Sequence, residues 1–120
     1  MAQTLPPALE DKIRNYENQR RIYESFKAQN LVTQQELSEI SLTVEELKKH
    51  PEDAVAYKAV GSVMFQVEKS KLTADLEERE ETLKRRAEST GRKVTELETK
   101  LNEMKNEITI ELGKLNLTLQ

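Results

Sequence analysis

The side chains that could perform acid–base, nucleophilic or metal chemistry are few in this chain. It has no cysteine and a single histidine, His50, among 120 residues. Without cysteine it has no disulfide framework, no thiolate nucleophile and no thiolate metal site. His50 directly precedes Pro51, at the expected end of a helix, where the helix dipole favours a cation. We therefore interpret His50 as a surface or capping residue and expect no metal site.

The carboxylates and glycines offer no better candidate for catalysis. The 22 acidic residues are interspersed with 19 basic ones, as on solvated helix faces. Gly61 and Gly91 are isolated, whereas a phosphate-binding loop needs several glycines in one short motif. The sequence therefore predicts no catalytic residue, no cofactor and no enzyme activity.

Charge and hydropathy also bear on the class of partner. The net charge is −3, whereas nucleic-acid binding requires clustered Lys and Arg. The short basic groups at 20–21 and 84–86 lie among glutamates. There is no apolar run of about 18 residues or more and no signal-peptide pattern. We expect a soluble, cytoplasmic protein that binds neither nucleic acid nor membrane.

The segment 8–50 shows the seven-residue repeat of a coiled-coil helix. Eight of its twelve seam positions are apolar, against 36% of the whole chain. Pro6 and Pro7 suit a helix start, and Pro51 marks its end because the residue before a proline is pushed away from helical geometry. The predicted seam consists of Leu9, Lys12, Tyr16, Gln19, Tyr23, Phe26, Asn30, Thr33, Leu37, Ile40, Val44 and Leu47.

The segment 73–117 shows a second seam, with Thr73 as the candidate N-cap. Nine of its twelve positions are apolar. A two-helix rod needs only such a narrow apolar stripe, so the charged fraction of 34% is no sign of disorder. The predicted seam consists of Leu76, Glu80, Leu83, Ala87, Thr90, Val94, Leu97, Leu101, Met104, Ile108, Glu111 and Leu115.

Between the helices, the segment 54–68 is rich in β-branched and aromatic residues, which suit a pleated surface. Gly61 and Ser62 separate two runs, and glycine is what the first central position of a type II′ turn requires. In that register one face carries Ala56, Val60, Val63, Phe65 and Val67, and the other carries Val55, Tyr57, Ala59 and Met64.

Both faces of this hairpin are largely apolar and both of its edges are unpaired. A lone hairpin is marginally stable in water, and an unpaired edge favours pairing with another chain. We predict that it completes a sheet or barrel built by several subunits; an intramolecular corner that caps the coiled coil is the alternative. The residues expected to carry assembly are Val55, Tyr57, Val60, Gly61, Val63, Phe65 and Val67.

A helix–hairpin–helix chain must run its helices antiparallel, but the sequence leaves two or three alignments open. Asn30, Thr33 and Thr90 fall in the middle of the seams. Polar residues there either specify the register at a cost in stability or are simply tolerated. Glu80, at another seam position, is expected to weaken packing near the hairpin or to face another subunit.

Apolar residues gather where the two termini are expected to meet. Ile110 and Leu117 fall off the helical stripe formed by their apolar neighbours, so some of this surface must be exposed. Exposed apolar patches often mark binding surfaces. A frayed tail with scattered leucines, favoured by Gly113, is the alternative. The set comprises Leu5, Leu9, Ile13, Ile108, Ile110, Leu112, Leu115, Leu117 and Leu119.

Residues 51–67, followed by Leu72 and Thr73 and then by 76–79, resemble the prefoldin β-type subunit family. In that family's hairpin an acidic residue precedes the equivalents of Tyr57, Lys58 and Gly61, and a hydrophobic second strand follows. The opening at 5–7 looks like archaeal members, and the resemblance covers nearly all of the chain. Glu80 and Arg85 depart from it, because the family usually carries apolar residues there.

The resemblance implies a hexamer of two α-type and four β-type subunits, whose hairpins build a β-barrel platform for the coiled coils. It also implies an ATP-independent holdase that captures unfolded proteins at the coiled-coil tips and delivers them to a group II chaperonin. Only one hairpin fits between the helices, as in a β-type subunit. The residues that would hold clients are Leu5, Leu9, Ile13, Ile108, Leu112, Leu115, Leu117 and Leu119.

The expected fold is mainly α: a long antiparallel two-helix coiled coil, 8–50 and 73–117, joined by a single β-hairpin at 54–68 that assembles into an intersubunit β-barrel. We expect one domain over 1–120. The alternative function is a structural scaffold that dimerises through its heptad seam. Such a scaffold would form alone through its helices and survive deletion of the hairpin, and it leaves the β-like segment unexplained.

Overall fold

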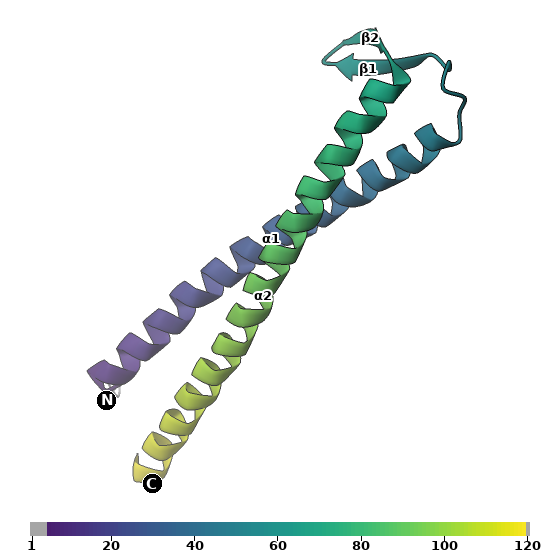
Figure 1. Ribbon diagram of the computed structural model, residues 1–120. Helices are drawn as coiled ribbons and strands as arrows, with labels where there is room; N and C mark the ends of the chain where they lie inside the picture. Colours follow the sequence, from purple (N-terminus) through teal and green to yellow (C-terminus); the bar gives the residue numbers. More distant parts are fainter. Residues whose placement is uncertain (1–4, 120) are drawn as a thin grey trace. The chain divides into compact units, whose positions relative to one another are not determined.

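The computed structural model describes residues 5–119, with side chains as far as Asn116. Its elements follow in the order α1 (Pro7–Lys48), β1 (Ala56–Val60), β2 (Val63–Val67) and α2 (Lys69–Leu119) (Figure 1). The described part of the chain is therefore mainly α, with an antiparallel two-stranded hairpin between two long helices. This confirms the predicted fold class at the level of the single chain.

Both ends of α1 are set by prolines. The carbonyl of Pro6 accepts hydrogen bonds from the backbone N–H groups of Leu9 and Glu10, each at 3.0 Å, so Pro7 is the first helical residue. At the other end, the amides of Lys49 and His50 bond to carbonyls three residues back, at 3.2 Å. These tighter bonds end the helix two residues before the predicted limit, because the chain must leave helical geometry ahead of Pro51.

The second helix begins four residues earlier than predicted, because Thr73 is not its N-cap. The Thr73 hydroxyl donates to the carbonyl of Lys69 at 2.8 Å, which is the backward bond of a threonine inside a helix. The Leu72 N–H bonds to the carbonyl of Glu68 at 3.0 Å, so the helix follows β2 almost directly. It then continues through Gly113 to Leu119.

The hairpin has the predicted two-residue turn. Five residue pairs run from Ala56 opposite Val67 to Val60 opposite Val63, which leaves Gly61 and Ser62 as the loop. Gly61 has a φ of 59°, and it is the only residue with a positive φ in the described chain. A positive φ at the first central position alone is what a type II′ turn requires, and only glycine adopts it without steric cost.

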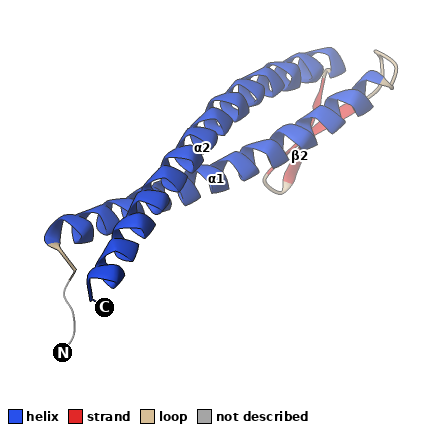
Figure 2. Cartoon of the chain, turned by 90° about the horizontal axis from the view of Figure 1, so that it is seen from below, coloured by secondary structure: helices blue, strands red, loops and turns tan. Residues whose placement is uncertain are grey.

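The chain divides into two compact units, each built from one stretch of each helix. The terminal unit contains the described residues 5–29 and 90–119, and the hairpin unit contains 30–89. In the terminal unit Leu9, Leu97 and Leu101 are buried, and in the hairpin unit Val44 and Leu83 are buried. In Figure 2 the strands of the hairpin unit appear in red; β1 and the last turns of α1 line a common hollow.

The heptad seams are confirmed by burial. None of the twelve predicted seam residues in α1, and none of the twelve in α2, is exposed. Contacts between the helix stretches also give the alignment that the sequence left open. Lys12 pairs with Glu107 in the terminal unit, and in the hairpin unit Glu36 pairs with Arg79 and Lys48 with Glu77.

The polar seam residues have different surroundings. Glu80 accepts a hydrogen bond from the Ser41 hydroxyl at 2.7 Å, so this departure from an apolar seam is compensated inside the hairpin unit. Thr33 is buried. The side-chain oxygen of Asn30 is buried without a hydrogen-bond partner among the described residues. A buried acceptor without a partner lowers the stability of the folded chain, so Asn30 is an unfavourable residue at this seam position.

Candidate functional site

The hairpin carries a concentrated exposed apolar surface. Among the described residues, twelve large apolar side chains are exposed, and six of them lie within the eleven residues 55–65. Their exposed fractions run from 52% to 67%. They are Val55, Tyr57, Val60, Val63, Met64 and Phe65.

The strand register confirms how these residues divide between the two faces. Val60 is opposite Val63 and Ala56 is opposite Val67, so these four share a face with Phe65. Directly opposite Phe65 on that face is Lys58, a charge that the sequence interpretation left out. The other face carries Tyr57, Ala59, Met64 and Gln66. An uncovered sheet with two apolar faces and free edges is suited to pair with, and pack against, strands of another chain.

The base of the hairpin contains a buried lysine that the sequence did not point to. The Lys69 side chain is only 7% exposed, and its Nζ donates a hydrogen bond to the backbone carbonyl of His50. This contact joins the chain entering the hairpin to the chain leaving it. No sequence pattern marks it, because it depends on how the two ends of the hairpin segment come together.

The predicted client-binding residues of the terminal unit are not equally accessible. Leu9 is 2% exposed, because it lies at a seam position against α2, whereas Leu112 is 37% exposed. Ile110, which the sequence placed off the helical stripe, is 60% exposed. Leu5, Ile13, Ile108 and Leu115 are half-buried. The side chains of Leu117 and Leu119 lie outside the described residues.

A shallow hollow of about 240 Å³ lies beside these residues in the terminal unit. Its lining is mainly apolar and carries one acidic and one basic side chain at its rim. It is formed by Pro6, Ala8, Leu9, Glu111, Lys114 and Leu115. The structure therefore brings the first turn of α1 and the last turns of α2 together, as predicted for the two termini.

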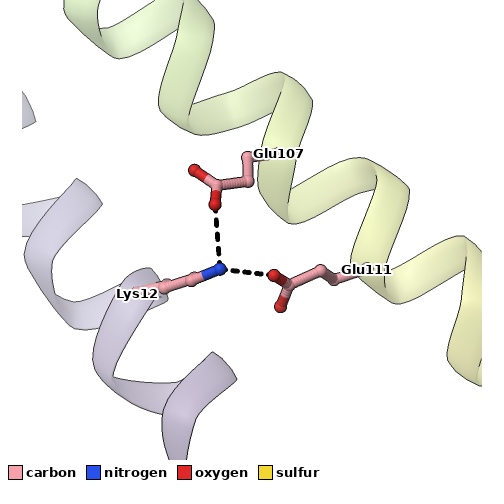
Figure 3. A network of polar contacts seen from close by, with 3 residues as sticks. All are labelled: Lys12, Glu107 and Glu111. Carbon is pink, nitrogen blue, oxygen red and sulfur yellow. Dashed lines mark hydrogen bonds and ion pairs between the residues drawn. The ribbon is translucent and has the colours of Figure 1, made fainter.

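A cation at a seam position holds the helix stretches of the terminal unit together. Lys12 extends from α1 to the carboxylate of Glu107, at 2.9 Å, and to that of Glu111 on α2 (Figure 3). The hydrogen bonds to Glu111 and then to Glu107 raise the pKa of Lys12 above its usual value. The network is solvent-accessible, so it contributes more to alignment than to stability.

Groups suited to catalysis or metal binding are sparse in the described chain. His50 is exposed, with Nε2 at 3.6 Å from a carboxylate oxygen of Glu46, one helical turn away. No group of three or more histidine or acidic side chains in residues 5–119 is placed to hold a metal ion. Within the same residues, neither helix has a stretch long and apolar enough to cross a lipid bilayer.

Four further apolar residues are exposed on α1: Ile22, Leu31, Val32 and Leu42. They lie outside the predicted seam, and the sequence interpretation assigned them no role. Singly exposed apolar residues are common on protein surfaces.

Comparison with known proteins gives a consistent result. The chain matches the family described as Prefoldin subunit over residues 8–115. It is 31% identical to the prefoldin subunit beta of Pyrobaculum neutrophilum over 115 residues, which covers 96% of this chain and 90% of that protein. It is 33% identical to the prefoldin subunit beta of Thermococcus gammatolerans over 110 residues, covering 92% and 91%.

A solved structure shows the same fold. The crystal structure of the prefoldin beta subunit from Thermococcus strain KS-1 aligns with a TM-score of 0.80 at 31% identity, over 92% of this chain and 97% of that one. The family match spans both helices and the hairpin, and it includes the hairpin and the first turns of α2, which carry most of the resemblance. The chain therefore belongs to the prefoldin family of chaperones, as a subunit of the beta type.

Proposed function

We propose that this chain is a subunit of a hetero-oligomeric prefoldin, with two α-type and four β-type subunits, that holds unfolded proteins without ATP and delivers them to a group II chaperonin in the cytoplasm. The whole chain, 1–120, acts as one domain in this proposal. The activity is binding, and no bond is made or broken by this chain. The observation that carries the proposal is the hairpin segment, which has six large apolar side chains more than half exposed, on both of its faces.

Assembly is assigned to the hairpin. Its exposed fractions of 52% to 67% would be unfavourable for a chain that stayed alone, because burial of apolar area stabilises by roughly 25 cal/mol per Å². Pairing of β1 or β2 with a neighbouring hairpin would cover the faces and satisfy the free edges together. Backbone pairing is directional, so it suits an assembly of fixed composition such as a β-barrel platform.

Client capture is assigned to the helix ends of the terminal unit. Ile110 and Leu112 are exposed there, and Leu5, Ile13, Ile108 and Leu115 are half-buried around them. Side chains of this kind give weak contacts that depend little on the client's sequence. Several subunits acting on one client would raise the overall affinity through effective concentration, without any tight single contact.

One member of the predicted client-binding set has another role in this proposal. Leu9 is buried against α2, so it supports the surface from beneath and does not contact the client. Leu117 and Leu119 continue the same helix end and stay in the proposed client-binding set on sequence grounds alone.

The proposal is tested by suppression of aggregation of a chemically denatured protein, without nucleotide, by this chain mixed with an α-type subunit. The comparison is the same mixture made with a chain that ends at Glu107, which retains the hairpin unit entirely. We expect protection from the full chain and loss of protection in the shortened one, while both form the complex. Equal protection by both chains would place client capture elsewhere.

A structural scaffold that dimerises through its seam is the competing function. It predicts a complex that forms from this chain alone and survives deletion of 54–68. Against it, the seam positions are already covered inside each unit, while the exposed apolar surface is concentrated on the hairpin. A stable complex with no protection of any denatured protein would favour the scaffold.

A further inference from the structure

The most unusual side chain outside the proposed binding surfaces is Lys69. Only two polar or charged side chains in the described chain are buried, Thr33 and Lys69, and Lys69 is the only one with a charge. Lysine is almost never fully buried unless its ammonium group is paired or hydrogen-bonded, because removing the charge from water is costly. The ammonium of Lys69 has its partner in the carbonyl of His50.

This contact closes the base of the hairpin. Lys69 is the first residue of α2, and His50 lies two residues beyond the end of α1, so the bond spans 19 residues that contain both strands. The strands are hydrogen-bonded to each other, and no hydrogen bond in the described chain links either strand to a helix. The hairpin is therefore tied across its base by one side chain.

The surroundings of Lys69 make this tie more important. Three separate hollows of about 530, 610 and 340 Å³ lie around the base of the hairpin, and Lys69 lines all three. Tight packing of side chains is therefore not what fixes the strands on the helix stretches of the hairpin unit. A hairpin held by two short connections and loose packing would sample many orientations without a further restraint.

The chemistry of the contact explains why the residue is a lysine. The His50 carbonyl lies in the turn after α1 and accepts no backbone hydrogen bond from the described residues, so the Lys69 ammonium supplies its partner. The methylene chain of Lys69 is buried at the base of the hairpin, and its end supplies the donor. A methionine would fill similar space but leave the His50 carbonyl without that donor.

We propose that Lys69 is a positioning residue that fixes the orientation of the hairpin on the helix stretches of the hairpin unit. Its consequence for assembly rests on the proposed function of the hairpin; the positioning itself does not. A hairpin already held in one orientation loses less conformational freedom when it pairs with a neighbouring subunit. Lys69 thereby favours assembly without belonging to the assembly surface.

The orientation can be measured with two spin labels in the full-length chain. The chain has no native cysteine, so S62C in the turn and E78C on the exposed side of α2 give one defined pair within the hairpin unit. The distance distribution is recorded by pulsed electron spin resonance for the labelled parent chain and for K69M, K69R and K71M in the same background. Lys71 is exposed, two residues away, so K71M is a matched control that removes one charge without touching His50.

We expect the distribution to broaden about twofold in K69M and to keep its parental width in K71M and K69R, because a guanidinium can still donate to the carbonyl. An unchanged distribution in K69M overturns the proposal. Loss of helicity in K69M, with K69R fully helical, also overturns it, because Lys69 would then act in folding of the chain.

Assembly with an α-type subunit separates this proposal from the proposed function. We expect K69M to weaken assembly about tenfold through lost preorganisation, while K71M stays close to the parent. Failure of the unlabelled parent chain to assemble would reject the assembly role of the hairpin. The width of the distance distribution in K69M would still test whether Lys69 fixes the orientation of the hairpin. Assembly of K69M at the parental affinity, with a broadened distribution, would overturn the link between orientation and assembly.

Discussion

The terminal unit and the hairpin unit share a heptad seam but expose their apolar residues on different elements. In the terminal unit Ile110 and Leu112 are exposed on the flank of a helix whose backbone groups bond to one another. In the hairpin unit the exposed apolar residues lie mainly on two strands, whose outer edges have backbone groups free to bond. A strand edge offers directional hydrogen bonds, whereas a helix flank offers only apolar contact. The difference suits fixed assembly at one unit and tolerant capture at the other.

The two units also differ in how their helix stretches are aligned. In the terminal unit a single lysine, Lys12, serves two carboxylates of α2. In the hairpin unit the pairs Glu36–Arg79 and Lys48–Glu77 and the Ser41–Glu80 hydrogen bond are separate. Exposed ion pairs contribute little to stability, so their main effect is to select one alignment of the seams.

The largest effect is expected when charges are placed on the hairpin. V63D/F65D/V67D should abolish assembly with an α-type subunit, lowering affinity by more than about a hundredfold, because unpaired carboxylates would be buried in the interface. Helicity should be largely retained, since none of the three residues belongs to a helix. Circular dichroism and size-exclusion chromatography with light scattering measure the two properties.

A matched triple variant is available on α1 of the same unit. L31D/V32D/L42D changes three exposed apolar residues outside the seam and should leave assembly intact. Assembly of the hairpin variant at normal affinity would reject the barrel hypothesis. Equal loss in both variants would show that added charge alone prevents assembly.

The second prediction compares two leucines of the terminal unit. Leu9→Ala should lower the free energy of unfolding by about 3 kcal/mol, because it removes a buried side chain from the seam. Leu112→Ala should lower it by less than about 1 kcal/mol, because that side chain is partly exposed. Urea denaturation of the two variants measures the difference. Similar losses in both would mean that Leu112 is a packing residue and not part of a binding surface.

The third prediction uses the same substitution in each unit. Gly61→Ala should destabilise the hairpin by about 1–2 kcal/mol, because its φ of 59° is strained for any residue with a Cβ. Gly91→Ala should raise the free energy of unfolding by about 0.5–1 kcal/mol, because a Cβ there meets no atom within 4 Å and alanine favours a helix. Assembly affinity reports the first change and thermal unfolding the second. An equal response at both positions would contradict the turn assignment.

The smallest effect concerns the pH dependence of the terminal unit. The folded chain raises the pKa of Lys12, so its contribution is fully present below the unfolded value of about 10.4 and is lost as the pH rises through the folded value. The difference in Tm between the parent chain and Lys12→Met should therefore stay constant up to about pH 10 and shrink at higher pH. Lys100→Met, at an exposed position of α2, is the control and should show no such change. A difference that stayed constant at the higher pH as well would contradict the assigned network.

Much of the fold follows from local patterns in the sequence. None of the seam positions that the seven-residue repeat predicted is exposed, because the seam side of a coiled-coil helix is set by its own periodicity. Gly61 marked the turn, because a positive φ nearly always requires glycine there. The prediction that Thr73 caps α2 placed the start of that helix too late. A threonine can either cap a helix or bond backward inside it, and its sequence context does not distinguish the two.

Features that depend on contacts between distant residues could not be predicted. The alignment of the helix stretches is set by pairs such as Glu36 with Arg79, which any of several shifts could have replaced. Lys69 looks like an ordinary surface lysine in the sequence, and only closure of the hairpin's base gives it a partner.

The central claim is that the hairpin unit joins this chain to the other subunits and that the terminal unit binds unfolded proteins. The most direct test measures oligomeric mass and suppression of aggregation on the same samples of V63D/F65D/V67D and I110S/L112S, each mixed with an α-type subunit. We predict that the hairpin variant loses the complex, and that I110S/L112S keeps the parental mass but protects a denatured protein several-fold less. A terminal variant that loses the complex, or one that keeps both its mass and full protection, would contradict this division.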